Sequence, residues 1–204
     1  MLLTHLQEKP LEDYLSFIKT CALNGLTSVQ LRHKGATFKE TYDFGRKLKD
    51  ILDPLNIPLI VNDNAQLAKD LEAFGVHLGN QDDSYEKARN LLKKDKAIGL
   101  SIESFKDLEK ANLVDVSYVA ASAVFQTPTK SNVKTLWGDH GVRDLAQLSN
   151  HPVIAIGGIA LDNAKSVLEA GAKGLCVIGA LHNASNPAVA CKEFKKLLDQ
   201  YLVA

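Results

Sequence analysis

Short apolar runs alternate along this chain with longer segments of helical period, and this alternation limits the possible folds more than any single motif does. The runs are almost continuously apolar, which is typical of parallel strands covered on both faces. Eight such runs occur, at residues 1–4, 28–31, 58–62, 75–78, 97–101, 116–120, 152–156 and 174–178.

Amphipathic segments that predict helices lie between these runs, at residues 11–24, 38–52, 162–170 and 187–202. Ser84 is a suitable N-cap for a further helix beginning at residue 85. Eight strands with intervening helices in 204 residues predict one domain over residues 1–204, an α/β fold of the (β/α)₈ TIM-barrel type. An open, doubly wound sheet is the alternative, because a sequence alone does not show that a sheet closes.

The charge balance excludes several classes of partner. Lys plus Arg and Asp plus Glu both number 24, so the formal net charge is zero. A protein that binds nucleic acid through its phosphates normally carries a basic excess, so we expect no nucleic-acid partner. We expect no membrane association either, because no signal peptide or apolar stretch of membrane-spanning length is present. Three scattered cysteines predict reduced thiols and a cytoplasmic protein.

The polar residues that directly follow the apolar runs are the candidates for chemistry, because the carboxyl ends of barrel strands meet on one face. The segment 121–138 supplies further candidates, because it is a long connection without periodic structure. Such connections in a compact domain are usually functional or disordered. The candidates in chain order are Gln30, Arg32, Lys34, Asn62, Asp63, Asp82, Asp83, Ser101, Thr127, Thr129, Lys130, Gly157, Gly158 and Gly179.

These residue types together indicate a phosphorylated substrate. Arg32, Lys34 and Lys130 suggest an anion, but Asp63 and Asp82 beside them would repel it. A divalent metal held by the carboxylates and by phosphate oxygens resolves the conflict, and Mg²⁺ commonly binds in this way. Glycines after the seventh and eighth strands are placed where barrels often hold a second phosphate on backbone N–H groups.

Each candidate also has a purely structural interpretation. Asp63 could cap the helix that follows it. The pair Asp82–Asp83 could complement the partial positive charge at a helix N-terminus. Arg32 and Lys34 could form a solvated strand end, and Gly157–Gly158 a simple tight turn. The histidines are expected to be packed side chains rather than metal ligands, because none has a second histidine at ligand spacing; this applies to His33, His77 and His182.

A series of short motifs in order along the chain resembles the thiamine-phosphate synthase family. The motifs are VQLRHK at 29–34, VNDN at 61–64, GVHLGNQD at 75–82, IGLS at 98–101, TPTK at 127–130 and AIGGI at 155–159. The resemblance implies a (β/α)₈ barrel and a transferase of thiamine biosynthesis. This enzyme couples hydroxymethylpyrimidine diphosphate to hydroxyethylthiazole phosphate, releasing pyrophosphate and forming thiamine phosphate.

The resemblance also implies roles for individual residues. It places the diphosphate on Arg32, Lys34, Asn62, Ser101 and Lys130, of which Arg32, Ser101 and Lys130 are the catalytic candidates. It places the pyrimidine on Gln30, Mg²⁺ on Asp63 and Asp82, and the thiazole phosphate on Thr127, Thr129, Gly158, Ile178 and Gly179.

This chain departs from the family pattern at three places. Gly179 stands where many members have serine, GNQD stands where GQED is commoner, and WGDH at 137–140 has no assigned role.

Other functions remain as alternatives to the synthase. A thiazole tautomerase shares the fold but needs neither a diphosphate site nor a metal. A non-catalytic paralogue could bind thiamine precursors and act as a regulator. A sugar-phosphate epimerase would need a His/Asp metal set at the strand ends, which the sequence lacks. The sequence leaves open whether the protein forms a homo-oligomer.

Overall fold

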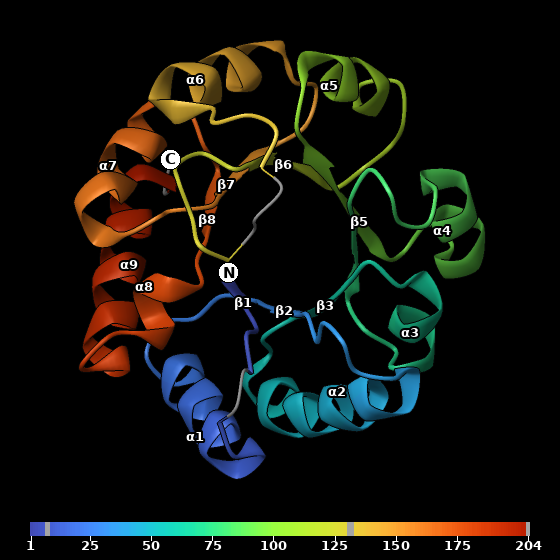
Figure 1. The fold of residues 1–204 in the computed structure, drawn as a ribbon, viewed down its shortest axis with the longest axis vertical. Helices are drawn as coiled ribbons and strands as arrows, with labels where there is room; N and C mark the ends of the chain where they lie inside the picture. The colour runs from blue at the N-terminus through green and yellow to red at the C-terminus, as the bar shows by residue number, and fades with distance from the viewer. Residues whose placement is uncertain (7–8, 130–132, 203–204) are drawn as a thin grey trace.

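The computed structural model describes residues 1–6, 9–129 and 133–202, in which a ring of parallel strands is surrounded by helices (Figure 1). The strands are β1 Leu2–Leu3, β2 Val29–Leu31, β3 Leu59–Asn62, β4 Gly75–Leu78, β5 Ala97–Ile102, β6 Tyr118–Ser122, β7 Val153–Ile156 and β8 Gly174–Cys176. The helices are α1 Leu11–Ala22, α2 Phe38–Leu52, α3 Ala65–Asp70, α4 Tyr85–Leu92, α5 Phe105–Ala111, α6 Gly138–Leu148, α7 Leu161–Glu169, α8 Gly179–His182 and α9 Pro187–Leu202, with a 3₁₀ turn, η1, at Asp53–Leu55.

The sheet closes into a barrel. Strands pair in the order β1 to β8, each parallel to the next. A parallel bridge between Leu2 and Val177 joins the two ends, where Leu3 N–H donates to Val177 O (3.1 Å) and Val177 N–H donates to Met1 O (3.0 Å). The predicted (β/α)₈ barrel is therefore confirmed, and the open doubly wound sheet is wrong.

Alternation along each strand divides its side chains between two environments. Outward-facing residues such as Val29, Val61 and Val76 are fully buried in the large core shared with the helices. Inward-facing residues such as Ile60 and Tyr118 fill the inside of the barrel. Because side chains fill the interior, ligands must bind at the ends of the strands and in the loops above them.

Five helices agree with the predicted segments, although α1 ends at Ala22, two residues before the predicted end. Ser84 caps α4 as predicted, since its side chain accepts from Lys87 N–H. The short helices α3 and α5 were not predicted, because six or seven residues are too few to establish a helical period. Cys21, Cys176 and Cys191 are free and buried, as expected.

Trp137 anchors the connection between β6 and α6, which gives the WGDH segment a structural role. Its ring is buried, its Nε1–H donates to Ile102 O (3.2 Å), and its backbone N–H donates to Ala123 O (3.0 Å). Phe105 packs edge-on against it, with ring centroids 5.3 Å apart. The connection is thus fixed to the ends of β5 and β6. In the described part of the chain, no helix has the length and apolar character to cross a membrane.

Candidate active site

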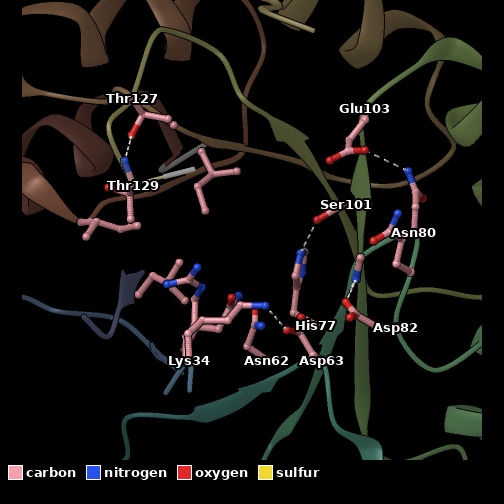
Figure 2. A pocket seen from close by; sticks show the side chains of 18 of the residues that line it. Lys34, Asn62, Asp63, His77, Asn80, Asp82, Ser101, Glu103, Thr127 and Thr129 are labelled. Carbon is pink, nitrogen blue, oxygen red and sulfur yellow. Dashed lines mark hydrogen bonds and ion pairs between the residues drawn. The ribbon is translucent and has the colours of Figure 1, made fainter. Parts of the chain in front are cut away.

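A cavity of about 330 Å³ opens at the carboxyl ends of the strands. Figure 2 shows Lys34, Asn62, Asp63, Asp82 and Ser101 around one side of this space, with Thr127 and Thr129 facing them from the connection after β6. We call it the first cavity. The predicted residues that line it are Gln30, Arg32, Lys34, Asn62, Asp63, Asp82, Ser101, Thr127, Thr129, Gly157 and Ile178.

Asp63 follows β3 in an unusual backbone conformation. Its φ is +68°, in the left-handed region that side chains other than glycine rarely adopt, and its N–H donates to His77 O (2.8 Å). Such strain tends to persist at functional positions. Asn64, not Asp63, caps α3 by accepting from Leu67 N–H (2.9 Å). The carboxylate of Asp63 instead pairs with Lys34 Nζ at 3.0 Å (Figure 2).

Asp82 approaches Asp63 from the loop after β4. The residue lies at the exposed rim, but its Oδ2 turns inward to accept from Gly79 N–H (2.6 Å). Partial loss of solvent around the carboxyl group, together with the neighbouring Asp63, raises the pKa of Asp82 to about 6. Ser84 is the N-cap of α4 and Asn64 is the N-cap of α3, so neither Asp82 nor Asp63 occupies an N-cap position.

Asp83, the other candidate carboxylate in this loop, points to different partners. It pairs with Lys87 and accepts from Ala65 N–H (3.4 Å). It therefore ties the loop to α3 and α4 and is not among the residues that line the first cavity.

Arg32 is held at the end of β2 by Thr4. The Arg32 N–H donates to Thr4 Oγ1 (2.7 Å), and the Thr4 hydroxyl donates to Arg32 O (2.9 Å). Partial burial lowers the pKa of Arg32, and Asp63 opposes this shift. Lys130, the third predicted cation, lies outside the described residues.

The wall formed by β5 holds an ion pair that the sequence analysis missed. Glu103 has only 9% of its side chain exposed and pairs with Lys134 Nζ at 2.8 Å, and both residues line the first cavity. Glu103 stands two residues after Ser101. Because alternate residues of a strand point to the same face, this spacing was a sequence signal that Glu103 lies on the same side as Ser101. No sequence signal marked Lys134, which lies in an irregular connection.

A buried polar group forms part of the floor of the cavity. His77 Nε2 lies 2.9 Å from Ser101 Oγ, and His77 Nδ1 lies 3.1 Å from the Tyr118 hydroxyl. The rings of His77 and Tyr118 stack, with centroids 5.5 Å apart. Gly99 makes this possible, since a Cβ there would come within 2.1 Å of the Tyr118 ring. His77 is therefore packed, as predicted, but it also lines the site.

A second cavity, of about 380 Å³, adjoins the first and shares Thr127, Thr129, Gly157 and Ile178 with it. Gly158 and Gly179 line it as well. Gly158 has a φ of +66°, and a Cβ there would lie 2.6 Å from Gln126 O. At this position only glycine fits. Two histidines, His5 and His182, also line this cavity, and no pattern in the sequence marked either as a site residue.

Two adjoining cavities, one with cations and a carboxylate pair and the other with glycine turns, are typical of barrel enzymes that act on phosphorylated small molecules. Comparison with known proteins agrees with that class. The model of the family described as thiamine monophosphate synthase matches residues 1–181. The chain belongs to this family, and is thereby a transferase of thiamine biosynthesis.

Individual relatives share most of their length with this chain. Thiamine-phosphate synthase of Chlamydia caviae is 44% identical over 202 residues, covering 99% of this chain and 95% of that one. The synthase of Albidiferax ferrireducens is 40% identical over 175 residues, covering 86% and 80% of the two chains. The solved structure of thiamine phosphate pyrophosphorylase from Pyrococcus furiosus superposes with a TM-score of 0.88 at 29% identity, covering 98% and 95%.

Proposed function

We propose that this protein joins hydroxymethylpyrimidine diphosphate to hydroxyethylthiazole phosphate, with the diphosphate substrate in the first cavity and the thiazole phosphate in the second. The observation that carries the proposal is the shared wall of Thr127, Thr129, Gly157 and Ile178. Two separate phosphorylated molecules bound on either side of that wall have their reacting ends beside each other. Such positioning contributes a large part of the rate of a two-substrate reaction.

In the first cavity, the protein's task is to stabilise negative charge on the leaving diphosphate. The bond between the pyrimidine methylene carbon and the diphosphate oxygen breaks, and the oxygen keeps the electron pair. Arg32, Lys34 and Lys130 supply positive charge to that oxygen and its phosphates, with Asn62 and Ser101 as hydrogen-bond donors. Gln30, buried in the floor, binds the pyrimidine end. The thiazole nitrogen then supplies the electron pair of the new carbon–nitrogen bond.

Asp63 and Asp82 are suited to holding Mg²⁺. Their oxygens are hard ligands, and the pKa of Asp82 is raised first by partial burial and then by the neighbouring Asp63 carboxylate. The described residues contain no group of three or more metal-binding side chains, which fits a cation that takes its other ligands from phosphate and water. When bound, Mg²⁺ would neutralise charge on the diphosphate. Lys34, now paired with Asp63, would be released to bind phosphate oxygens.

The second cavity binds the thiazole phosphate mainly through backbone groups. Gly158 allows the close approach that a side chain would prevent, and the hydroxyls of Thr127 and Thr129 add donors at the shared wall. Ile178 and Gly179, at the start of α8, contribute backbone groups that face the phosphate.

The test is incubation of the purified protein with both substrates and Mg²⁺, followed by measurement of thiamine phosphate and pyrophosphate in equal amounts. Omission of either substrate, or addition of a chelator, should stop product formation. Binding of both substrates without turnover would overturn the proposal in favour of a regulatory paralogue. Isomerisation of a thiazole carboxylate phosphate without coupling would overturn it in favour of a tautomerase.

A further inference from the structure

We propose that His5 recognises the phosphate group held in the second cavity. Its imidazole, when protonated, donates a hydrogen bond to the phosphate and places a positive charge beside it. This inference rests on the proposed function, because it takes the ligand of that cavity to be a phosphate monoester. His5 lines the second cavity together with Gly158 and Gly179.

The position of His5 is fixed by its neighbours. It follows β1 directly after Thr4, whose hydroxyl is bonded to both backbone groups of Arg32. The backbone N–H of His5 donates to the hydroxyl of Tyr14, a fully buried residue of α1 (2.8 Å). Because Thr4 and the His5 N–H hold the backbone at this point, a ligand of the cavity meets His5 without a large cost of ordering the main chain.

The other histidine of the cavity, His182, is committed to a structural role. Its Nδ1 lies 2.8 Å from Ile178 O, which accepts only from a protonated nitrogen. The Nε2 of the neutral ring then accepts from the Tyr14 hydroxyl (2.8 Å). Burial lowers the pKa of His182, which favours this neutral form. His182 therefore holds α1 and the start of α8 together rather than binding the ligand.

The charge of the ligand gives His5 its importance. Among the described residues that line the second cavity, only the two histidines can carry a positive charge, and there is no carboxylate. A phosphate monoester carries between one and two negative charges near neutral pH. Because the proposed function places Lys130 and Arg32 on the diphosphate, His5 is the cation that remains for this phosphate.

Binding of the phosphate should be coupled to uptake of a proton by His5. The charged and titratable groups around it are Arg32 directly after β2, Tyr14 on α1 and His182 on α8. Lys9, before α1, acts in turn on His182. Burial, and then Arg32, lower the pKa of His5 in the empty cavity. A phosphate beside the ring should raise the pKa of His5, and so should a diphosphate that neutralises Arg32. Both ligands therefore favour the imidazolium.

The experiment compares steady-state kinetics of the wild-type chain with His5→Gln and His5→Ala, with His140→Gln on the exposed side of α6 as the matched control. At about pH 6.5, His5→Gln should raise KM for the thiazole phosphate roughly tenfold and His5→Ala somewhat more, as expected for loss of a charged hydrogen bond. KM for the pyrimidine diphosphate should stay within roughly twofold of wild type. The control should match wild type in both.

Two further measurements distinguish phosphate recognition by His5 from a role of His5 in supporting the fold. The unphosphorylated hydroxyethylthiazole should be used equally well by wild type and His5→Gln, so that the preference for the phosphate falls roughly tenfold in the variant. The rise in wild-type KM for the thiazole phosphate between about pH 6.5 and pH 8.5 should also be reduced in the variant.

The outcomes distinguish the two proposals. No turnover by the wild-type chain would overturn the proposed function and this inference with it. Normal wild-type turnover with unchanged KM in His5→Gln would overturn the role of His5 alone. A loss of melting temperature with equal losses on both thiazoles would also overturn it, since His5 would then only support the fold.

Discussion

The two cavities proposed to bind phosphate groups are lined by different kinds of group. The first is lined by charged side chains, among them Arg32, Lys34, Asp63 and Asp82, whereas the second relies on glycines, threonines and imidazoles. Charged groups are suited to a molecule whose negative charge grows during the reaction, because fixed charges then stabilise the transition state more than the ground state. Backbone groups are suited to a molecule that must only be held in place. Substitutions should therefore affect kcat in the first cavity and KM in the second.

The largest expected effect is that of Asp82→Asn in the first cavity. Loss of one metal-binding carboxylate should lower Mg²⁺-dependent turnover by about three orders of magnitude, corresponding to several kcal/mol of lost charge stabilisation. The measurement is kcat across a Mg²⁺ titration. Asp83→Asn is the matched control, since Asp83 pairs with Lys87 outside the cavity. Near-normal turnover in Asp82→Asn would remove Asp82 from the metal site.

Lys130→Ala should lower kcat by about 30- to 1,000-fold, or about 2–4 kcal/mol, because positive charge beside the leaving diphosphate is lost. Lys94→Ala, an exposed lysine after α4, controls for the change in net charge. Unchanged kcat at saturating substrates would exclude Lys130 from the mechanism and weaken the contrast between the two cavities.

Gly158→Ala should act on the second cavity, with a cost of about 1–3 kcal/mol. The new Cβ would meet Gln126 O at 2.6 Å on a backbone with a φ of +66°, and would move the turn that we propose binds the thiazole phosphate. KM for the thiazole phosphate should rise while KM for the pyrimidine diphosphate changes little. Gly138→Ala is the control, because it has a positive φ but open space around its Cβ. Equal effects from both would show that backbone strain alone is responsible.

Gly179→Ser should have a smaller and opposite effect in the same cavity. A Cβ at residue 179 meets only Asn183 Nδ2, at an ordinary contact distance of 3.5 Å, so the serine fits. Its hydroxyl should tighten binding of the thiazole phosphate by about 0.5–1.5 kcal/mol, seen as a lower KM. A higher KM would mean that the glycine itself is needed for close approach of the phosphate.

The smallest effect concerns stability of the ligand-free protein. The pKa of Asp82 in the folded state, about 6, lies above the ordinary value of an aspartate in the unfolded chain, so ionisation of Asp82 opposes folding. This penalty is complete above about pH 6 and disappears below about pH 4. Asp82→Asn should therefore melt slightly higher than wild type at neutral pH, with the difference fading in acid. A lower melting temperature at all pH values would indicate that the carboxylate supports the loop.

Much of the site could be predicted because barrel strands impose a simple rule on the sequence. Polar residues that follow an apolar run must lie on the rim, so the order of residues alone was enough to place Arg32, Asp63 and Asp82 there. The rule does not cover residues in irregular connections, which explains why Lys134 was missed. It also leaves the direction of each rim side chain open, so Asp82 and Asp83 could not be separated.

The sequence by itself determined the order and number of the strands, the family, and the chemical types of group at the rim, because all three depend on local pattern and composition. The tertiary structure decided what depends on contacts between distant segments. It closed the barrel through Leu2 and Val177 and made Asn64 and Ser84 the helix caps, which left Asp63 and Asp82 beside each other. It also brought His5 and Gly179 to the same cavity. Local patterns specify which elements form, but only packing specifies which side chains meet.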